Sequence, residues 1–262
     1  MRSLSEALFA KHDPQVLAAL RESTVGIAGA GGLGSNVAIS LARAGVGRLI
    51  VADFDRVEPS NLNRQQYFVR QIGRRKVLAL RENLMAINPF AKYTVHAARV
   101  TRANVGRIFG EAEILVEAFD KAATKRMLID AWLSLHPDRP IVAASGLAGY
   151  GKNRKLHTRR MGSLYLCGDE ESECPKGISP MAPRVAIVAN LQANLVVELL
   201  VDRASPAARG SRRPAAPSGR ARPRHPRPQA ATDPRSPEAG AHPPGPPAGR
   251  GVPRSSEPAR RG

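Results

Sequence analysis

The chain has 262 residues, 42% of them hydrophobic, so it is long enough to form one or two domains with a sizeable core. Its formal net charge of +18 suggests a nucleic-acid-binding protein, but residues 203–262 hold 13 arginines against three acidic residues and carry +10 of it. Much of the basic charge therefore lies outside any folded site, and we expect no specific nucleic-acid partner.

Residues 203–262 differ in composition from the rest of the chain. They contain 14 of the 22 prolines and no Leu, Ile, Phe, Tyr or Trp. Such a segment cannot bury enough apolar surface to offset its conformational entropy, so we predict a disordered tail after a folded region of residues 1–202. The tail is either a nonspecific cationic arm or low-complexity sequence without a role, for example from an altered reading frame.

Targeting signals are not evident. Charges interrupt the apolar positions of residues 1–23, unlike the core of a signal peptide, and no continuous apolar run reaches the ~20 residues needed to cross a bilayer. The chain has only two cysteines. We therefore expect a cytoplasmic protein without a membrane partner.

Predicted strands and helices alternate along the folded region. The first strand ends at a glycine, and the helix after it stops at Gly45. A buried strand over 48–55 follows. In chain order we predict strands at 24–29, 48–55, 92–100, 113–119 and 140–146, and helices at 34–45, 73–88, 102–112 and 121–137.

The pattern changes after Gly149. Two short β-like segments, 155–160 and 163–168, precede a polar loop, and Pro183 can open a last helix that ends near residue 201. Together these elements predict an α/β fold: a Rossmann-like, mainly parallel sheet with helices on both faces and a small antiparallel β extension.

Three groups of candidate residues follow the carboxyl ends of predicted strands, where parallel sheets bind ligands. The first is the G-x-G-x-x-G of Gly29, Gly31 and Gly34, a turn in which backbone N–H groups and a helix N-terminus can hold a phosphate. The alternative is that the glycines serve only the close packing of helix on strand. The motif alone indicates a nucleotide without specifying which one.

Asp53 lies 19 residues after Gly34, where a carboxylate can bind a ribose, in NAD and ATP alike. Arg64 and Lys76 come next. Each alone would be an ordinary surface charge, but together, after the ribose acid, they suit a triphosphate better than a pyrophosphate. Asp120 ends an apolar strand, where its carboxylate can hold Mg²⁺, cap the helix expected to begin at Lys121, or do both.

The run "GAGGLGSNVAISLARAGVGRLIVADFDRVEPSNLNRQ", with "GRRK" and "EAFD" behind it, resembles the ThiF/MoeB/HesA superfamily of ubiquitin-activating-enzyme-like adenylyltransferases. Residues 1–202 are most similar to the short, single-domain ThiF proteins, the adenylyltransferases of the sulfur carrier protein ThiS in thiamine biosynthesis. The segments that carry this closer similarity are "VEPSNLNRQQYFVRQIG", "VEAFDKA", "AASGLAGYG", "CGDEESE" and "MAPRV".

The resemblance implies a reaction in which the C-terminal glycine carboxylate of a ubiquitin-like carrier attacks the α-phosphorus of ATP and releases pyrophosphate. Catalysis would then depend on positioning and charge neutralisation. Catalytic roles are implied for Arg64, Lys76 and Asp120, with Mg²⁺ on Asp120. Contacts to ATP are implied for these three residues and for Gly29, Gly31, Gly32, Gly34, Asp53, Ser60, Asn61, Asn63 and Gln65.

The chain departs from its relatives at three points. Many relatives bind zinc through two Cys-x-x-Cys pairs, but Cys167 and Cys174 cannot supply four ligands, and we predict no zinc. Cys167 is either a sulfur-transfer cysteine or a small buried hydrophobe. The resemblance also implies a homodimer completed by an N-terminal arginine of the partner, and the corresponding motif is not evident in residues 1–15.

Other functions remain open at this point. The carrier could instead serve a molybdopterin, cysteine or peptide pathway, or the domain could be an NAD-dependent oxidoreductase or an inactive scaffold. An oxidoreductase would leave Arg64 and Lys76 unexplained. The basic "KNRKLHTRRMG" is either a solvated hairpin or a docking face for an acidic carrier, and the acidic "GDEESE" is expected to be a mobile loop that could cover the adenylate.

Overall fold

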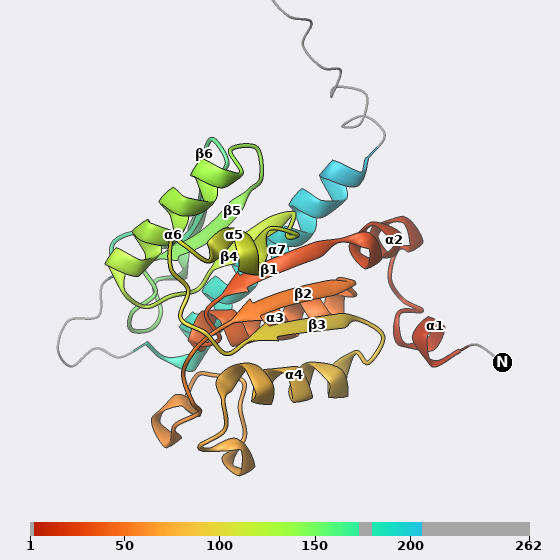
Figure 1. Cartoon of the computed structure of the whole chain (residues 1–262), viewed down its shortest axis with the longest axis horizontal. Coiled ribbons are helices and arrows are strands. Elements are labelled where there is room, and N and C mark those ends of the chain that lie inside the picture. The colour runs from red at the N-terminus through yellow and green to blue at the C-terminus, as the bar shows by residue number, and fades with distance from the viewer. Residues whose placement is uncertain (1–2, 173–179, 206–262) are drawn as a thin grey trace, which may run out of the picture. The chain divides into compact units, whose positions relative to one another are not determined.

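The computed structural model describes residues 3–172 and 180–205 (Figure 1). Residues 206–262, which make up nearly all of the predicted tail, lie outside the described residues, and so does Cys174.

The core of the fold is one seven-stranded sheet in the order β3-β2-β1-β4-β5-β7-β6. Six strands are parallel, and β6 runs antiparallel to β7 at the edge. This confirms the predicted parallel sheet with its small antiparallel extension. The strands are β1 (Thr24–Ala28), β2 (Arg48–Ala52), β3 (Lys92–His96), β4 (Ile114–Glu117), β5 (Ile141–Ser145), β6 (His157–Met161) and β7 (Leu164–Gly168).

The chain reverses its direction of travel across the sheet between β1 and β4. From β1 it passes to β2 and β3 on one side, and it then returns to form β4 and β5 on the other. Such a switch point opens a crevice at the carboxyl ends of the two central strands, since the connections leave in opposite directions. The fold therefore places the first glycine turn and the turn after β4 side by side.

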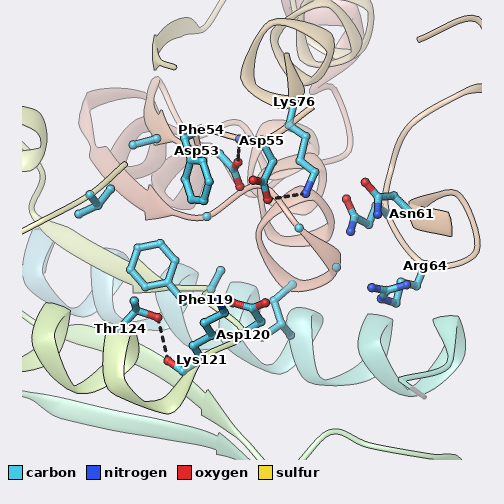
Figure 2. A pocket seen from close by; sticks show the side chains of 18 of the residues that line it. Asp53, Phe54, Asp55, Asn61, Arg64, Lys76, Phe119, Asp120, Lys121 and Thr124 are labelled. Atoms are coloured by element: carbon cyan, nitrogen blue, oxygen red, sulfur yellow. Dashed lines mark hydrogen bonds and ion pairs between the residues drawn. The ribbon is translucent and has the colours of Figure 1, made fainter. Parts of the chain in front are cut away.

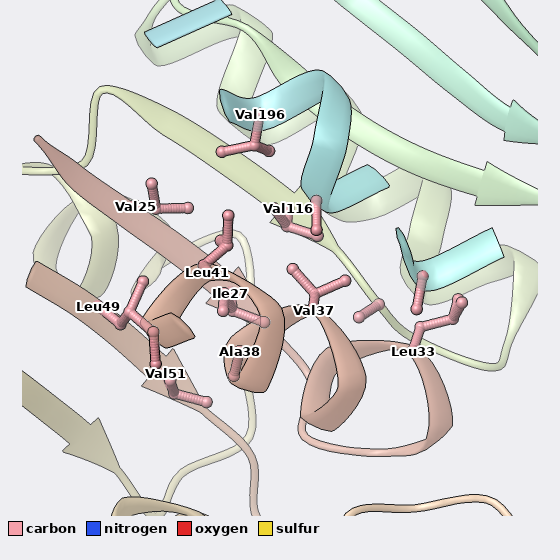
Figure 3. Close-up of a cluster of buried hydrophobic side chains, with 14 of the residues drawn as sticks. Val25, Ile27, Leu33, Val37, Ala38, Leu41, Leu49, Val51, Val116 and Val196 are labelled. Carbon is pink, nitrogen blue, oxygen red and sulfur yellow. The ribbon is translucent and has the colours of Figure 1, made fainter. Parts of the chain in front are cut away.

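Helices cover both faces of the sheet, as the sequence predicts. One buried apolar cluster joins the sheet to α3 (Gly32–Ala44), α4 (Lys76–Ile87) and α7 (Ala182–Ala204), and Figure 3 shows part of it. A second cluster joins the opposite face to α5 (Val105–Phe109) and α6 (Ala122–Leu135). The central strands β1, β2, β4 and β5 are buried on both faces, which explains why they read as continuous apolar runs, whereas the edge strand β6 is exposed.

Strand β1 shows how the two faces divide the sequence. Val25 and Ile27 pack into the first cluster, and Ala28 packs into the second. At Gly26 a Cβ atom would come within 2.9 Å of side-chain atoms of both Leu115 and Phe109. The glycine in the middle of this strand is therefore required by close packing.

Two N-terminal helices, α1 (Leu4–Leu8) and α2 (Pro14–Glu22), were not predicted. Both begin with standard caps: Ser3 forms a capping box with Glu6, and the Asp13 side chain accepts hydrogen bonds from the first turn of α2. Helix α1 is too short for a clear 3.6-residue apolar pattern and buries no side chain, whereas α2 carries such a pattern in Val16, Leu17 and the buried Leu20.

Among the residues that the structure describes, α7 is the one helix long and apolar enough to cross a membrane by length and composition. Its sequence is not a continuous apolar run, because Asn190, Gln192 and Asn194 interrupt it. In the fold α7 packs along α3 and also contacts α2, β5 and β7. A core helix meets the same two criteria, and Arg184 and Gln192 are buried within this packing.

Candidate nucleotide site

A cavity of about 490 Å³ lies at the carboxyl ends of β1, β2 and β4 (Figure 2). The glycine turn, the β2–α4 loop, the segment after β3 and the β4–α6 turn contribute to its wall. The three groups of candidate residues found in the sequence thus meet at one cavity. The predicted residues on its wall are Gly29, Gly31, Gly32, Asp53, Asn61, Arg64, Gln65, Lys76 and Asp120.

The glycine turn serves both packing and ligand space, at different positions. Gly29 has φ +103°, and a Cβ there would come within 2.6 Å of the Ala118 carbonyl oxygen; a Cβ on Gly34 would overlap the carbonyl oxygen of Gly29. At Gly31, in contrast, the nearest atom is Gln65 Nε2 at 3.9 Å. Packing therefore explains Gly29 and Gly34, whereas Gly31 keeps the cavity open beside the N-terminus of α3.

Asp53 follows β2 and is held by two backbone amides. Its Oδ2 accepts a hydrogen bond from Ala30 N–H and its Oδ1 accepts one from Asp55 N–H, both at 2.7 Å. The Tyr67 hydroxyl donates to the Ala30 carbonyl at 2.7 Å and secures the same turn. Because each carboxylate oxygen has a second lone pair, Asp53 can still accept two hydroxyl groups in a fixed orientation.

Two cations lie at the other end of the cavity from Phe54 and Phe119 (Figure 2). Lys76, the first residue of α4, is 6% exposed, and its Nζ lies 3.1 Å from Asp55 Oδ2. The Arg64 guanidinium donates to the Ser60 carbonyl at 3.2 Å and to Asn63 Oδ1 at 2.8 Å. Ser60 and Asn63 do not line the cavity; they hold Arg64 in place.

Gln65 and Asn61 add buried amides beside these cations. Asn61 Oδ1 accepts a hydrogen bond from Glu58 N–H at 3.1 Å. Gln65 is 8% exposed, and its Oε1 has no hydrogen-bond partner within the part of the chain that the structure describes. Since an unpaired buried polar atom costs about 1–3 kcal/mol, this is the pattern expected where a ligand supplies the missing bond.

Asp120 lies on the cavity wall and is exposed. It makes no hydrogen bond or ion pair with any other residue in 3–172 or 180–205. Helix α6 begins at Ala122 with Lys121 at the N-cap position and without a side-chain cap, so the alternative role of Asp120 as helix cap is wrong. The carboxylate is available to a cation.

Those same residues contain no cluster of three or more His, Cys, Asp or Glu side chains that could hold a metal ion by themselves. Magnesium commonly binds to one or two carboxylates and completes its shell with phosphate and water. The free carboxylate of Asp120 fits that mode of binding.

Sequence reasoning missed the apolar end of the cavity, where Phe54, Arg99 and Phe119 contribute to the wall. The Arg99 guanidinium carbon lies 3.9 Å from the centre of the Phe54 ring. Aromatic and stacked cationic groups can pack against a nucleobase. Two single aromatic residues and one arginine, each after a different strand, give no pattern that a sequence could reveal.

A buried ion pair beside the cavity was also missed. Glu117 at the end of β4 is fully buried, and Lys125, whose side chain lies on the cavity wall, approaches its Oε2 to 2.9 Å. Burial raises the pKa of Glu117, and the charge of Lys125 opposes that shift. The two residues are eight positions apart, so only the fold brings them together.

Cys167 is fully buried in β7 and does not line the cavity. Burial raises the pKa of its thiol, which disfavours the reactive thiolate. Its Sγ lies 3.7 Å from the Thr158 hydroxyl. This is the environment of a small packed hydrophobe.

The basic hairpin is partly neutralised by the acidic loop after it. Glu170 binds Arg159 and lies 3.1 Å from His157, and Glu171 pairs with Lys155 at 2.5 Å. This part of the acidic loop is therefore anchored by ion pairs to β6 and to the turn that precedes it. The remainder of "GDEESE", from residue 173 on, lies outside the described residues.

The ThiF family matches residues 4–234 of the chain. The chain belongs to the ThiF family. The match confirms the resemblance to the ThiF superfamily, and its range runs past residue 202, the predicted end of the folded region.

Curated relatives carry related names. A sulfur carrier protein adenylyltransferase of Thermus thermophilus is 32% identical over 203 residues, which cover 72% of this chain and 73% of the relative. The adenylyltransferase and sulfurtransferase uba4 of Emericella nidulans is 32% identical over 69% of this chain and 40% of its own length. The chain spans about two fifths of the length of this relative and of the uba4 protein of Aspergillus niger.

Solved structures share the fold. The E. coli tRNA N6-threonylcarbamoyladenosine dehydratase TcdA, in complex with ATP, has a TM-score of 0.68 at 20% identity and covers 78% of this chain and 94% of its own. E. coli MccB with AMPCPP and MccA has a TM-score of 0.55 at 24% identity, covering 74% and 60%. At these identities the similarity concerns the fold alone.

Proposed function

We propose that this protein adenylates the C-terminal glycine carboxylate of a ThiS-like sulfur carrier protein, using ATP and releasing pyrophosphate. The observation that carries the proposal is the single cavity onto which Asp53, Gly31, Arg64, Lys76 and Asp120 all face. The names of the curated relatives, which are adenylyltransferases, support the same reaction class.

In this proposal the nucleotide lies along the cavity from its apolar to its cationic end. The base packs against Phe54 and Phe119, and the fixed carboxylate of Asp53 accepts the ribose hydroxyls. The α-phosphate lies at Gly31, where the N-terminal N–H groups and the dipole of α3 favour negative charge. The reacting carboxylate and the α-phosphorus are thereby held together, which replaces an encounter in solution.

Lys76 and Arg64 act on the phosphates that leave. Their charges stabilise the negative charge that develops on pyrophosphate as the bond to the α-phosphorus breaks. Lys76 is suited to this role because burial and Asp55 restrict its side chain before ATP binds. Asp120 would hold Mg²⁺, which when bound neutralises phosphate charge.

The choice of carrier is the finer part of the proposal. We favour a ThiS-like carrier because of the motifs that the chain shares with short ThiF proteins, and a carrier of molybdopterin or cysteine metabolism is the alternative. The hairpin offers a surface for an acidic carrier, since Lys152 and Arg154 form no ion pair with any described residue. We further propose that the protein works in the cytoplasm, as a homodimer.

The test is ATP–pyrophosphate exchange with purified protein, Mg²⁺ and carriers ending in Gly-Gly, followed by the intact mass of each carrier. We expect exchange and an added AMP on one carrier. Lys76→Met should lower exchange about 100-fold, the usual loss when one group that stabilises transition-state charge is removed. Arg126→Gln, which removes an exposed charge from α6, should retain activity.

Absence of exchange with every carrier class would refute the proposal. An affinity for NAD well above that for ATP would favour an oxidoreductase. Transfer of AMP to a molybdopterin-type carrier in preference to a ThiS-like one would retain the reaction and replace the partner.

A further inference from the structure

Strands β4 and β5 separate near their carboxyl ends, at the edge of the sheet where Asp120 lies. Strands β4 and β5 pair only at Leu115–Ile141 and Val116–Val142. Beyond this point the amide of Gln192, on α7, donates from Nε2 to the carbonyl oxygens of both Glu117 and Val142, each at 3.1 Å. A side chain from a helix thus replaces the next strand-to-strand contacts and keeps the split open.

The side chain of Glu117 lies at the base of this split. Its Oε1 accepts a hydrogen bond from Phe119 N–H at 2.7 Å, which bends the chain into the β4–α6 turn. The Lys125 ammonium donates to Oε1 and Oε2 of Glu117 at 3.1 and 2.9 Å, and to the Ala144 carbonyl at 3.2 Å. All three ammonium donors are used within the protein, so Lys125 has none left for a ligand.

These contacts fix both ends of the segment that carries Asp120. Glu117 is bound on the strand side and Lys125 on the helix side, while Asp120 between them contacts no other residue that the structure describes. The place of the Asp120 carboxylate on the cavity wall is therefore set by its neighbours and not by any bond of its own.

We propose that Glu117 and Lys125 are positioning residues that fix the β4–α6 turn and thereby set the affinity of the nucleotide cavity for a divalent cation. This inference rests on the proposed function in one respect only, namely that Asp120 binds the divalent cation. Stability alone does not explain the pair, because a buried ion pair is commonly no more stabilising than apolar residues of the same volume. The position of the pair at the two ends of the turn that carries Asp120 explains it better.

The test compares binding of Mn²⁺–ATP with binding of ATP in excess EDTA, by calorimetry on the full chain without carrier. Glu117→Gln keeps the shape of the side chain and removes its charge. We expect it to weaken Mn²⁺–ATP binding about tenfold, as loss of a residue that orients a metal ligand commonly does, with metal-free ATP changed less than twofold. Lys125→Arg, which keeps the charge, should restore most of the affinity lost in Lys125→Met.

A double variant separates positioning from general damage. If Glu117 acts through Asp120, then Asp120→Asn/Glu117→Gln should bind Mn²⁺–ATP no more weakly than Asp120→Asn alone. Arg126→Gln is the matched control, since it breaks an exposed ion pair with Asp130 on the same helix. It should bind both forms of ATP as the unaltered protein does.

Three results would overturn the inference: unchanged binding of Mn²⁺–ATP by Glu117→Gln, an equal loss for metal-free ATP, or additive losses in the double variant. If Glu117→Gln does not fold, Glu117→Asp keeps the charge, shortens the reach and is judged by the same criteria. The assay uses no carrier and no turnover. The binding assay can therefore be interpreted even if the proposed adenylation fails, and the exchange assay can be interpreted even if this inference fails.

Discussion

Replacing Asp169 by asparagine removes one partner of a buried ion pair that fixes the start of α7. Arg184, 2% exposed, donates to Asp169 Oδ2 at 2.5 Å and to the Gly151 carbonyl. Asp169 also accepts hydrogen bonds from the backbone N–H groups of Glu171 and Ser172, at 3.0 and 2.8 Å. Asparagine can retain an acceptor for these amides, but it leaves the arginine charge buried without a counter-charge, with the Gly151 carbonyl still bound.

The magnitude follows from the burial of both groups. Removing one partner of a buried ion pair costs about 3–5 kcal/mol, because the remaining charge stays desolvated. Against a typical free energy of unfolding of about 5–15 kcal/mol, this is a large part of the stability. At roughly 2–4 °C per kcal/mol for a domain of this size, the melting temperature should fall by about 6–20 °C.

The pH dependence gives the prediction a second readout. Burial alone would raise the pKa of Asp169, but hydrogen bonds from Ser172 and Glu171 and the charge of Arg184 outweigh it and lower the pKa. A pKa lower in the folded than in the unfolded state gives stability that is complete above the unfolded value near 4 and is lost as the pH falls through the folded value. The difference between the unaltered protein and Asp169→Asn should therefore shrink on acidification.

Urea unfolding can be followed through Trp132, the only tryptophan in the chain and a fully buried one. Asp130→Asn is the control, because its pair with Arg126 at 3.7 Å is exposed and should contribute less than about 0.5 kcal/mol. A loss below about 1 kcal/mol for Asp169→Asn at neutral pH, or a loss that grows on acidification, would refute the reasoning.

Two further predictions concern the hairpin and the cysteine. Cys167 is buried, and burial raises the pKa of its thiol, so iodoacetamide at pH 8 should label it in a Cys174→Ser protein only after denaturation. Mass spectrometry would detect the label, and rapid labelling of the native protein would contradict the burial of Cys167. The Cys167→Ala variant should retain the proposed adenylation of the carrier. Hydrogen bonds to the Lys155 carbonyl and to Glu170 raise the pKa of His157, so its stabilising effect should be present below pH ~6.5 and disappear as the pH rises through the raised value. NMR titration should find that pKa above 6.5 and lowered by Glu170→Gln, and an unchanged value in the variant would exclude the contact.

The sequence predicted the sheet and its helices well because each element carries its own signal. Strands β1 and β2 are apolar runs, Gly45 ends α3 in the left-handed conformation with φ +97°, and Pro183 lies in the first turn of α7. Element ends were less well predicted. The helix expected over 102–112 is only Val105–Phe109, because tertiary contacts decide how far a short amphipathic segment stays helical.

Within the site, the sequence identified residues that belong to continuous motifs. Gly31, Asp53, Arg64 and Lys76 are separated by spacings that β–α connections impose, and the fold places all four on one cavity. The sequence does not distinguish residues that line the cavity from residues that hold a lining residue in place. Ser60 and Asn63 lie in the same motif, yet they hold Arg64 and do not face the cavity.

Local chemistry therefore determined by itself the order of strands and helices, the glycine turn, and the acidic and basic residues expected around a nucleotide. Only the tertiary structure paired Glu117 with Lys125, brought Phe54, Arg99 and Phe119 to one end of the cavity, and left Asp120 without a helix to cap. The physical reason is that periodicity and capping act over a few residues. Burial, ion pairing and the sharing of a cavity depend on which distant segments the sheet brings to the same edge.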